Sequence, residues 1–299
     1  MIKTTWVPVL FLVLAGTAAC GAAGSADAAA DAVRVRGEAY LNQGKHDLAI
    51  HAFDSAIALR PNDHLAFRSR GVAHRATDDF DRAIQDFDRA IALKPDFASA
   101  INSRGFAHQL KGDYERASLD FDRAIELAPG NPAAYRNRAN ARFILGRFAE
   151  AATDLERSVK FHADSVAAQP GKRFNETGGY AVVWLHIARM RSGQDDAAEF
   201  AANAARVDSV SWPRPVIAFF EGTLTADRLV AGTAAEADPR LRNDQRCGAE
   251  FFAGQAAMWK QQPSEARKRF ETVVSTCSKR FTEHAVAVAE LERLGASTK

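Results

Sequence analysis

The chain has 299 residues, of which 47% are hydrophobic and 25% charged, so it can bury the core of one large domain or two ordinary ones. Its 39 lysines and arginines nearly balance its 37 aspartates and glutamates, and charges of both signs alternate without forming blocks. This balance argues against a nucleic-acid-binding protein, because neutralising phosphates requires a basic face.

The N-terminal segment is typical of a secretory signal peptide. Lys3 lies in a short polar head, an apolar run extends from Trp6 to Ala15, and small residues lead to Cys20. The run is too short to span a bilayer, which favours a cleaved signal over residues 1–19.

A lipid anchor is predicted at the end of this signal. Thr17 to Cys20 resemble a bacterial lipobox, in which the cysteine is lipid-modified and becomes N-terminal after cleavage, although leucine is usual at the position of Thr17. The sequence therefore predicts lipid attachment at Cys20 and a flexible tether of Ala, Gly and Ser over residues 20–32. The alternative is an ordinary signal-peptidase site, which would give a soluble periplasmic or secreted protein.

The next part of the chain repeats itself. Residues 81–95, DRAIQDFDRAIALKP, return at 115–129 as ERASLDFDRAIELAP, a step of 34 residues. Four kinds of residue recur at the same step of 34. They are a small residue (Gly37, Gly71, Gly105, Ala139), an alanine (Ala49, Ala83, Ala117, Ala151), a large apolar residue (Phe53, Phe87, Phe121, Leu155) and a second small residue (Ala56, Ala90, Ala124, Ser158). Their spacing predicts two amphipathic helices in each unit, with a turn near Gly44, Gly112 and Gly146.

This pattern resembles the tetratricopeptide repeat (TPR), with four units over residues 33–163. The resemblance implies an all-α solenoid, in which each unit buries its apolar face against its neighbours and the array presents a concave surface.

One polar column is predicted to be structural. Arg36, Arg70, Arg104 and Arg138 are followed 16 residues later by Ala52, Asp86, Asp120 and Asp154. In a helix hairpin these positions lie at the same height, so we expect the ion pairs Arg70–Asp86, Arg104–Asp120 and Arg138–Asp154 rather than a ligand site.

A second stripe, along the first helix of each unit, is predicted to bind a ligand. Its residues mix guanidinium and amide groups with aromatic ones: Arg34, Arg68, Arg75, Asn102, Phe106, Gln109, Arg136, Asn140 and Phe143. Such a groove suits an extended peptide that carries carboxylates. The alternative is a helix face that only contacts solvent. In that case Phe106 and Phe143 would be neighbouring exposed aromatics, which favours the binding groove.

Beyond residue 163 the regular step is lost. Residues 164–180 are expected to form a linker, and 181–299 an irregular helical region that is interrupted at the sequence WPRP. Gly254, Ala266 and Phe270 restore the repeat spacing in a unit at 247–279, and residues 280–294 are expected to form a capping helix.

Cys247 and Cys277 are predicted to form a disulfide. They lie at the start of the first helix and near the end of the second helix of this last unit, and antiparallel helices bring such ends together. The alternative is two buried free thiols.

No residue pattern points to catalysis. The eight histidines form no H-E-x-x-H motif or His/Cys cluster, and the chain has no nucleophile elbow. The sequence predicts a protein that is not an enzyme, has no catalytic residues and needs neither cofactor nor metal.

The overall order of these segments resembles the NlpI-type TPR lipoproteins of Gram-negative bacteria, through the lipobox, YAVVWLHIARMRSG, WPRP and FTEHAVAVAELERL. The resemblance implies an outer-membrane lipoprotein that faces the periplasm and forms a homodimer. It would be a non-enzymatic adaptor for proteins such as peptidoglycan hydrolases and a processing protease. The alternative function is that of a component in an outer-membrane assembly or secretion machine.

Overall fold

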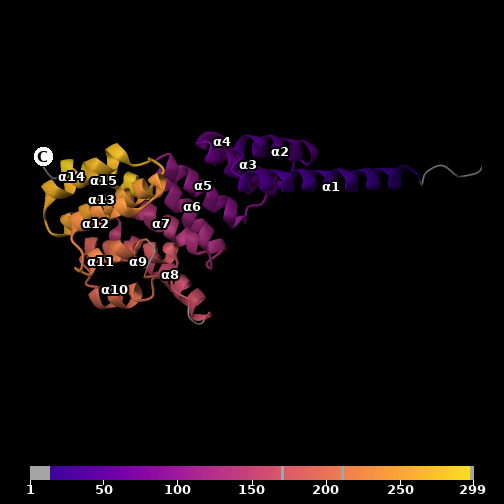
Figure 1. Cartoon of the computed structure of the whole chain (residues 1–299). Coiled ribbons are helices and arrows are strands. Elements are labelled where there is room, and N and C mark those ends of the chain that lie inside the picture. The colour runs from indigo at the N-terminus through magenta and orange to yellow at the C-terminus, as the bar shows by residue number, and fades with distance from the viewer. Residues whose placement is uncertain (1–13, 170–171, 210–211, 297–299) are drawn as a thin grey trace, which may run out of the picture. The chain divides into compact units, whose positions relative to one another are not determined.

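The computed structural model describes residues 14–169, 172–209 and 212–296, with side chains from Ala26 onward. Within these ranges the elements are helices, apart from an isolated bridge between Phe174 and Val207 (Figure 1). The chain divides into two compact units, residues 1–107 and 108–299. The all-α repeat architecture expected from the sequence is thereby confirmed.

The first unit consists of helix hairpins. Its helices are α1 (Leu14–Asn42), α2 (His46–Leu59), α3 (His64–Ala76), α4 (Phe80–Leu93) and the greater part of α5 (Ala98–Leu110). Neighbours in sequence pack together, α1 with α2, α2 with α3, and α3 with α4. The fully buried rings of Phe53 and Phe87 lie at the centres of the first two hairpins.

Residues 20–32 lie in helix α1, so the prediction of a flexible tether is wrong. Alanine is the best helix former, and here the alanine-rich segment also has a partner to pack against. Ala30 is fully buried, and Arg60 donates to Asp31 over 2.5 Å. Residues 1–13 of the expected signal peptide, and the side chain of Cys20, lie outside the described residues.

The turns inside the hairpins form where they were expected. Gly44, Gly112 and Gly146 have φ values of 71°, 83° and 78°, which glycine adopts without strain. The equivalent residue of the second repeat is Asp78, at φ 63°. Aspartate tolerates this left-handed region better than most residues, so the same turn forms without glycine.

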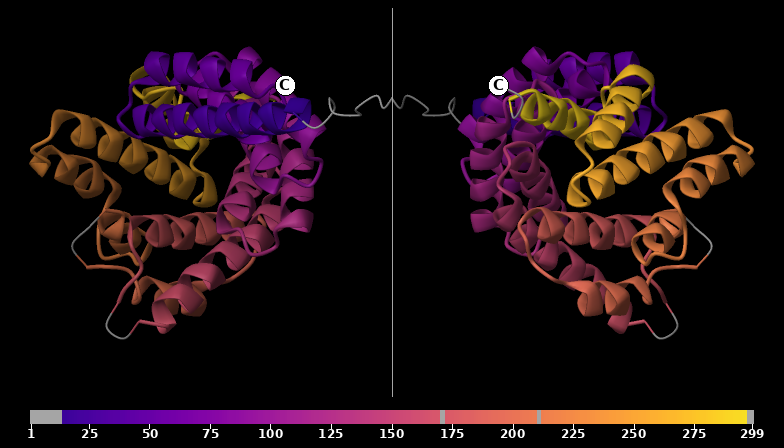
Figure 2. Two further views of the ribbon diagram at one scale, coloured as in Figure 1. Left: turned by 90° about the vertical axis from the view of Figure 1, so that its right-hand side faces the viewer. Right: turned by 90° about the vertical axis from the view of Figure 1, so that its left-hand side faces the viewer.

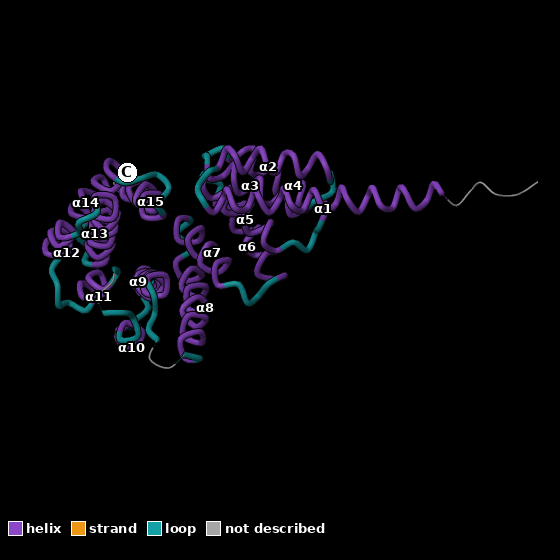
Figure 3. The backbone as a smooth tube through the Cα atoms, turned by 45° about the vertical axis from the view of Figure 1, so that its right-hand side comes forward, coloured by secondary structure: helices purple, strands orange, loops and turns teal. Residues whose placement is uncertain are grey.

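The second unit continues with α6 (Tyr114–Leu127), α7 (Pro132–Ile144) and α8 (Phe148–Ala167), and then becomes irregular. The irregular part contains α9 (Glu176–Arg191), α10 (Ala197–Ala204), α11 (Arg214–Phe220), α12 (Ala226–Gly232) and a 3-10 turn, Thr233–Ala235. The last repeat is formed by α13 (Pro239–Trp259) and α14 (Pro263–Thr276), and α15 (Thr282–Ala296) follows. Figure 3 shows that loops of varied length join these helices.

Two boundaries differ from the expected ones. Helix α9 begins at Glu176, so the linker predicted over residues 164–180 is shorter, and α13 begins at Pro239 rather than near residue 247. Both starts have a local cause, because the side chain of Asn175 accepts from the Gly178 amide and that of Asp238 from the Arg240 amide.

Aromatic side chains form the core of the second unit. Trp184 on α9 lies 5.2 Å from Phe143 on α7 and 5.2 Å from Phe251 on α13, measured between ring centroids. Phe270 on α14 extends the cluster at 6.1 Å from Phe251. The irregular helices therefore share one core with the fourth repeat.

Helix α15 returns to the fourth repeat as well as covering the last one. It packs on α7, α13 and α14, and Arg293 donates to the carbonyl oxygens of Phe143 and Ile144 at the end of α7. The last carbonyl oxygens of a helix lack the usual intrahelical donor, and here Arg293 donates to them in addition to the Gly146 amide, which donates to Phe143, so Arg293 also caps α7.

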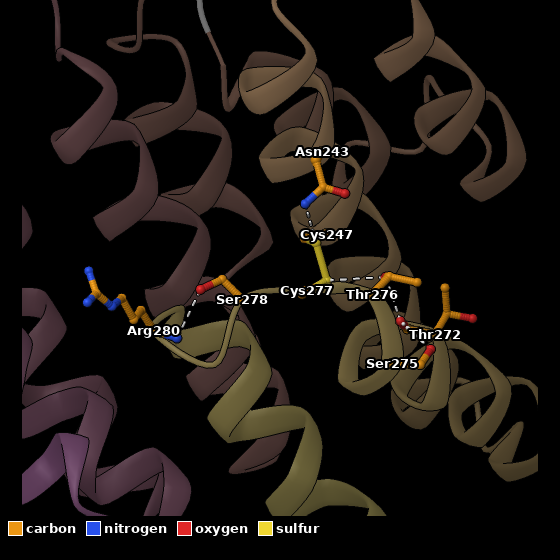
Figure 4. Close-up of a disulfide and its surroundings, with 8 residues drawn as sticks. All are labelled: Asn243, Cys247, Thr272, Ser275, Thr276, Cys277, Ser278 and Arg280. Atoms are coloured by element: carbon orange, nitrogen blue, oxygen red, sulfur yellow. Dashed lines mark hydrogen bonds between the residues drawn. A yellow bond between two sulfur atoms is a disulfide. The ribbon is translucent and has the colours of Figure 1, made fainter. Parts of the chain in front are cut away.

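A disulfide joins Cys247 on α13 to Cys277 at the end of α14, as Figure 4 shows. Their Cα atoms are 5.8 Å apart, and the amide of Asn243 lies 3.9 Å from the Cys247 sulfur. Helices α13 and α14, coloured from orange toward yellow in Figure 2, pack against each other. The antiparallel arrangement expected for this unit thus brings the two cysteines together.

Breaking this bridge is expected to lower the free energy of unfolding by about 3 kcal/mol, because it closes a loop with a sequence separation of 30 residues. Urea unfolding with and without reductant measures the loss, in a Cys20→Ala background that leaves only this cysteine pair. Two reactive thiols in the denatured, unreduced protein would contradict the bridge.

Candidate functional site

The Arg column expected to be structural forms ion pairs in both units. Arg70 makes a bidentate contact with Asp86, over 2.9 and 2.7 Å, and also donates to Asp54 over 2.6 Å. In the second unit Arg138 contacts Asp154 in the same way and donates to Asp122 over 2.6 Å. The guanidinium charges are therefore used within the fold.

Each of these arginines has a second carboxylate partner that was not predicted from the sequence. Asp54, Asp88 and Asp122 form a column of their own, and each lies 16 residues before its arginine. Arg104 donates to Asp88 over 2.6 Å, while its expected pairing with Asp120 stays a prediction. The regular spacing of these aspartates is visible in the sequence, but the pairing within one hairpin does not indicate this contact between successive hairpins.

Arg34 is engaged within the first unit. It donates to Glu38 over 2.7 Å and to Asp31 over 3.3 Å, and it lies 3.7 Å from Asp63. Asp63 also accepts from Arg60 and caps α3. Three carboxylates thus compete for this guanidinium, which makes Arg34 a poor candidate for binding a further one.

Arg68 and Arg75, on α3, differ from Arg34. Neither forms an ion pair in the part of the chain that the structure describes, and the Nε atom of each is buried without a hydrogen-bond partner. Burial lowers the pKa of both guanidinium groups, and the charge of Arg68 lowers that of Arg75 further. An arginine stays protonated under such conditions, so two positive charges lie near each other, and the nearby charge of Glu38 favours that of Arg68.

These charges are bordered by a cavity and an aromatic ring. The cavity, of about 460 Å³, is lined on α1 by Glu38 and Leu41 and on α3 by Arg68 and Val72. The Arg75 guanidinium lies over the half-buried ring of Phe106, 4.9 Å from its centroid. Asn102, also half-buried on α5, already interacts with another group of the protein, so it is not counted among the groups that are free to bind a ligand. The site therefore offers cationic forks beside apolar surface.

The stripe residues of the second unit are placed differently. Phe143 is 1% exposed and packs edge-on against Phe148 and Trp184, so the prediction that it lies open in a groove is wrong. Helices after the fourth repeat cover it, which no repeat pattern could indicate. Gln109 is 8% exposed, and its Oε1 atom has no hydrogen-bond partner.

Arg136 and Asn140 line a second cavity, of about 470 Å³, inside the second unit. This cavity was not predicted from the sequence, because most of its other walls come from α9, α13 and the start of α15. The only signal was the aromatic content of YAVVW, WPRP and RFTEH, which looks like ordinary core in a sequence.

The described residues give little support to metal or membrane-spanning sites. They contain no group of three or more His, Cys, Asp or Glu side chains that could hold a metal ion. None of their helices combines the length and apolar character required to cross a bilayer.

A tetratricopeptide repeat family model matches residues 34–96 and 107–168, while no curated protein matches the chain. Among solved structures, the MamA protein is 19% identical, with 60% of this chain and 90% of that chain covered and a TM-score of 0.49. The first TPR of Spaghetti (RPAP3), bound to the HSP90 peptide SRMEEVD, is 28% identical, with 39% and 92% covered and a TM-score of 0.38.

The second TPR domain of human RPAP3, in complex with the HSP70 peptide SGPTIEEVD, is 26% identical, with 38% and 94% covered and a TM-score of 0.37. The family match agrees with the helix hairpins and with the 34-residue step of the ion-pair columns. The chain therefore carries tetratricopeptide repeats at residues 34–96 and 107–168.

Proposed function

We propose that this protein is a non-enzymatic protein–protein interaction adaptor whose first unit binds an extended segment that carries carboxylates. One observation carries the proposal: Arg68 and Arg75 are half-buried on α3 without an ion pair among the described residues, and Arg68 lines a cavity of about 460 Å³. A guanidinium fork matches a carboxylate in shape and charge, and the match is stronger where water is partly excluded.

The rest of this surface suits a polypeptide better than a free anion. Leu41 and Val72 give the cavity an apolar side for a partner's side chain, and the ring of Phe106 holds the Arg75 guanidinium in place. An extended chain advances about 3.3 Å per residue, so a segment of about ten residues would reach several helices of the unit.

We also propose that the adaptor acts in the bacterial envelope, as an outer-membrane lipoprotein that is anchored through Cys20 and faces the periplasm. The lipobox-like residues and the resemblance to NlpI-type lipoproteins support this location. Peptidoglycan hydrolases and a processing protease are its proposed partners, and a homodimer its proposed form. The disulfide fits an oxidising compartment of this kind.

The double charge reversal Arg68→Glu/Arg75→Glu tests the binding site. We expect the affinity for a fluorescent peptide of about ten residues, with alternating Glu and Leu, to fall at least about tenfold, because attraction becomes repulsion. Binding by the wild type should weaken with salt, and a peptide with Gln in place of Glu should bind poorly. Fluorescence anisotropy measures each affinity.

The matched control is Arg82→Glu/Arg116→Glu, since these arginines are 69% and 71% exposed. It makes the same change in net charge at residues that do not line the cavity and should leave the affinity within about twofold, as expected for screened surface charges. Equal losses in both double variants would show a general charge effect and contradict the site. Circular dichroism checks that each variant is folded.

Cell fractionation tests the location. The wild type should sediment with outer membranes, and Cys20→Ala should appear in the soluble periplasmic fraction, because the attached acyl chains supply the anchor. A wild type that is already soluble in the periplasm would contradict the lipid anchor without affecting the binding site.

A further inference from the structure

The cavity of the second unit has a lining unlike that of the carboxylate site. Its volume is about 470 Å³, within the range of sites that take small ligands or single side chains. Tyr180 and Trp184 on α9, Trp212 before α11 and Phe281 before α15 contribute four aromatic side chains to its wall. The indole N–H of Trp212 donates to the Tyr180 hydroxyl over 2.6 Å, which fixes two of these rings.

Three carboxylates belong to the same lining: Glu176 at the start of α9, Asp244 on α13 and Glu283 at the start of α15. Throughout the ranges that the structure describes, none of them forms an ion pair, although arginines pair with acids in most of the fold. The pKa of Tyr180 is raised by burial, which is the largest cause, and by the charges of all three carboxylates.

Two of these carboxylates, Glu176 and Asp244, are exposed at the cavity, and Glu283 is half-buried. Burial raises the pKa of Glu283, a hydrogen bond with its own backbone opposes this shift, and the nearby charge of Asp244 adds to it. Partial burial also raises the pKa of Asp244, together with the charge of Asp238. A bound cation would remove this repulsion, since opposite charge favours the ionised carboxylate.

The remaining charged residue of the lining lies on another wall. Arg136 and Asn140 come from α7, and Arg136 is not ion-paired in the described part of the second unit. A guanidinium and an amide can hold the carbonyl oxygens of a polypeptide that passes the cavity. With three carboxylates against one guanidinium, and four aromatic side chains, the lining complements a cation on an apolar stem rather than an anion.

We propose that this cavity binds the ammonium or guanidinium end of a lysine or arginine side chain that a partner protein inserts. The aromatic rings enclose the aliphatic stem, Glu176, Asp244 and Glu283 receive the charge, and Arg136 with Asn140 contacts the partner's main chain. The cavity thus selects a basic residue, independently of the carboxylate site proposed for the first unit.

The test uses the full chain and Nα-acetyl-lysine methylamide as the probe. The indole N–H signals of Trp184 and Trp212 are followed by NMR, and Trp259, which is 52% exposed and outside the cavity, serves as an internal reference. We expect the first two signals to shift and the third to stay. Nα-acetyl-norleucine methylamide, which keeps the stem but lacks the charge, should bind at least about tenfold more weakly.

Asp244→Asn/Glu283→Gln should weaken binding of the lysine probe at least about tenfold, while Glu126→Gln/Glu271→Gln, which neutralises two exposed acids elsewhere, should leave it unchanged. Arg68→Glu/Arg75→Glu should also leave it unchanged, so this test and that of the carboxylate site fail separately. Equal binding of both probes, no effect of the Asp244/Glu283 variant, or no shift at about 50 mM lysine probe would overturn the proposal.

Discussion

Replacing Arg191 by methionine is expected to lower the free energy of unfolding by about 3–5 kcal/mol, because it removes one partner from a buried ion pair. Arg191, at the end of α9, contacts both carboxylate oxygens of Glu290 on α15, the second over 3.2 Å. It also donates to the Gln255 side chain on α13 over 2.9 Å. One guanidinium therefore ties together three helices of the second unit.

The large expected effect follows from burial. Glu290 and Gln255 are both 0% exposed, and the Arg191 guanidinium lies over the ring of Phe148, 4.4 Å from its centroid. Methionine fills a similar volume but leaves Glu290 with Arg293 alone, at 3.1 Å. Arg293 is itself committed to the end of α7, so it cannot replace the lost contacts.

Urea unfolding followed by circular dichroism measures this loss. The control is Lys160→Met, because Lys160 and Asp164 form an exposed pair at 3.5 Å, and such pairs contribute about 0–1 kcal/mol. Arg191→Met/Glu290→Leu should recover part of the stability, since an apolar pair leaves no buried charge. Similar small losses for Arg191→Met and Lys160→Met would show that the buried pair does not hold the helices together.

Contacts of this kind also mark the limit of prediction from the sequence. The repeats were predictable because each unit restates the same local pattern, so that helix starts, turns and the Arg70–Asp86 pair follow from spacing alone. The proximity of Cys247 and Cys277 follows in the same way from the antiparallel hairpin. Arg191 and Glu290 are 99 residues apart, and nothing near either one indicates its partner.

The wrong predictions for the candidate site share a cause, because each depends on which residues cover a helix face. Phe143 occupies the position of a groove residue but is buried by helices that follow the repeats, and Arg34 is engaged by acids on α1 and at the cap of α3. The cavity of the second unit was not predicted either, because its repeat residues face walls from segments that do not repeat, such as α9 and the residues before α11 and α15.

A steric rule relates two positions within each repeat, a small residue on the first helix and a large apolar one on the second. A Cβ atom added at Gly71 would lie 2.7 Å from the ring of Phe87, and one at Gly37 or Gly254 would lie 2.6 Å from Phe53 or Phe270. The fourth repeat has the buried pair Ala139 and Leu155 at the equivalent positions. A larger residue on the first helix thus goes with a smaller one on the second.

Phe87→Ala is expected to lower the free energy of unfolding by about 3–5 kcal/mol, because the fully buried ring leaves a cavity. Gly71→Ala should also destabilise, by about 1–2 kcal/mol, since the overlap with Phe87 outweighs the better helix propensity of alanine. Urea unfolding of each variant, with hydrogen exchange of the α3 and α4 amides, assigns the loss to this hairpin.

The decisive variant is Gly71→Ala/Phe87→Leu, which gives the second repeat the pair found in the fourth. Leucine lacks the ring atoms that a methyl at position 71 would meet, so each change should relieve the defect of the other. We expect the double variant to be more stable than the sum of Gly71→Ala and Phe87→Leu predicts, by a coupling of about 1–3 kcal/mol. Strict additivity would mean that Gly71 and Phe87 do not share one packing site, and that the glycine is required for another reason.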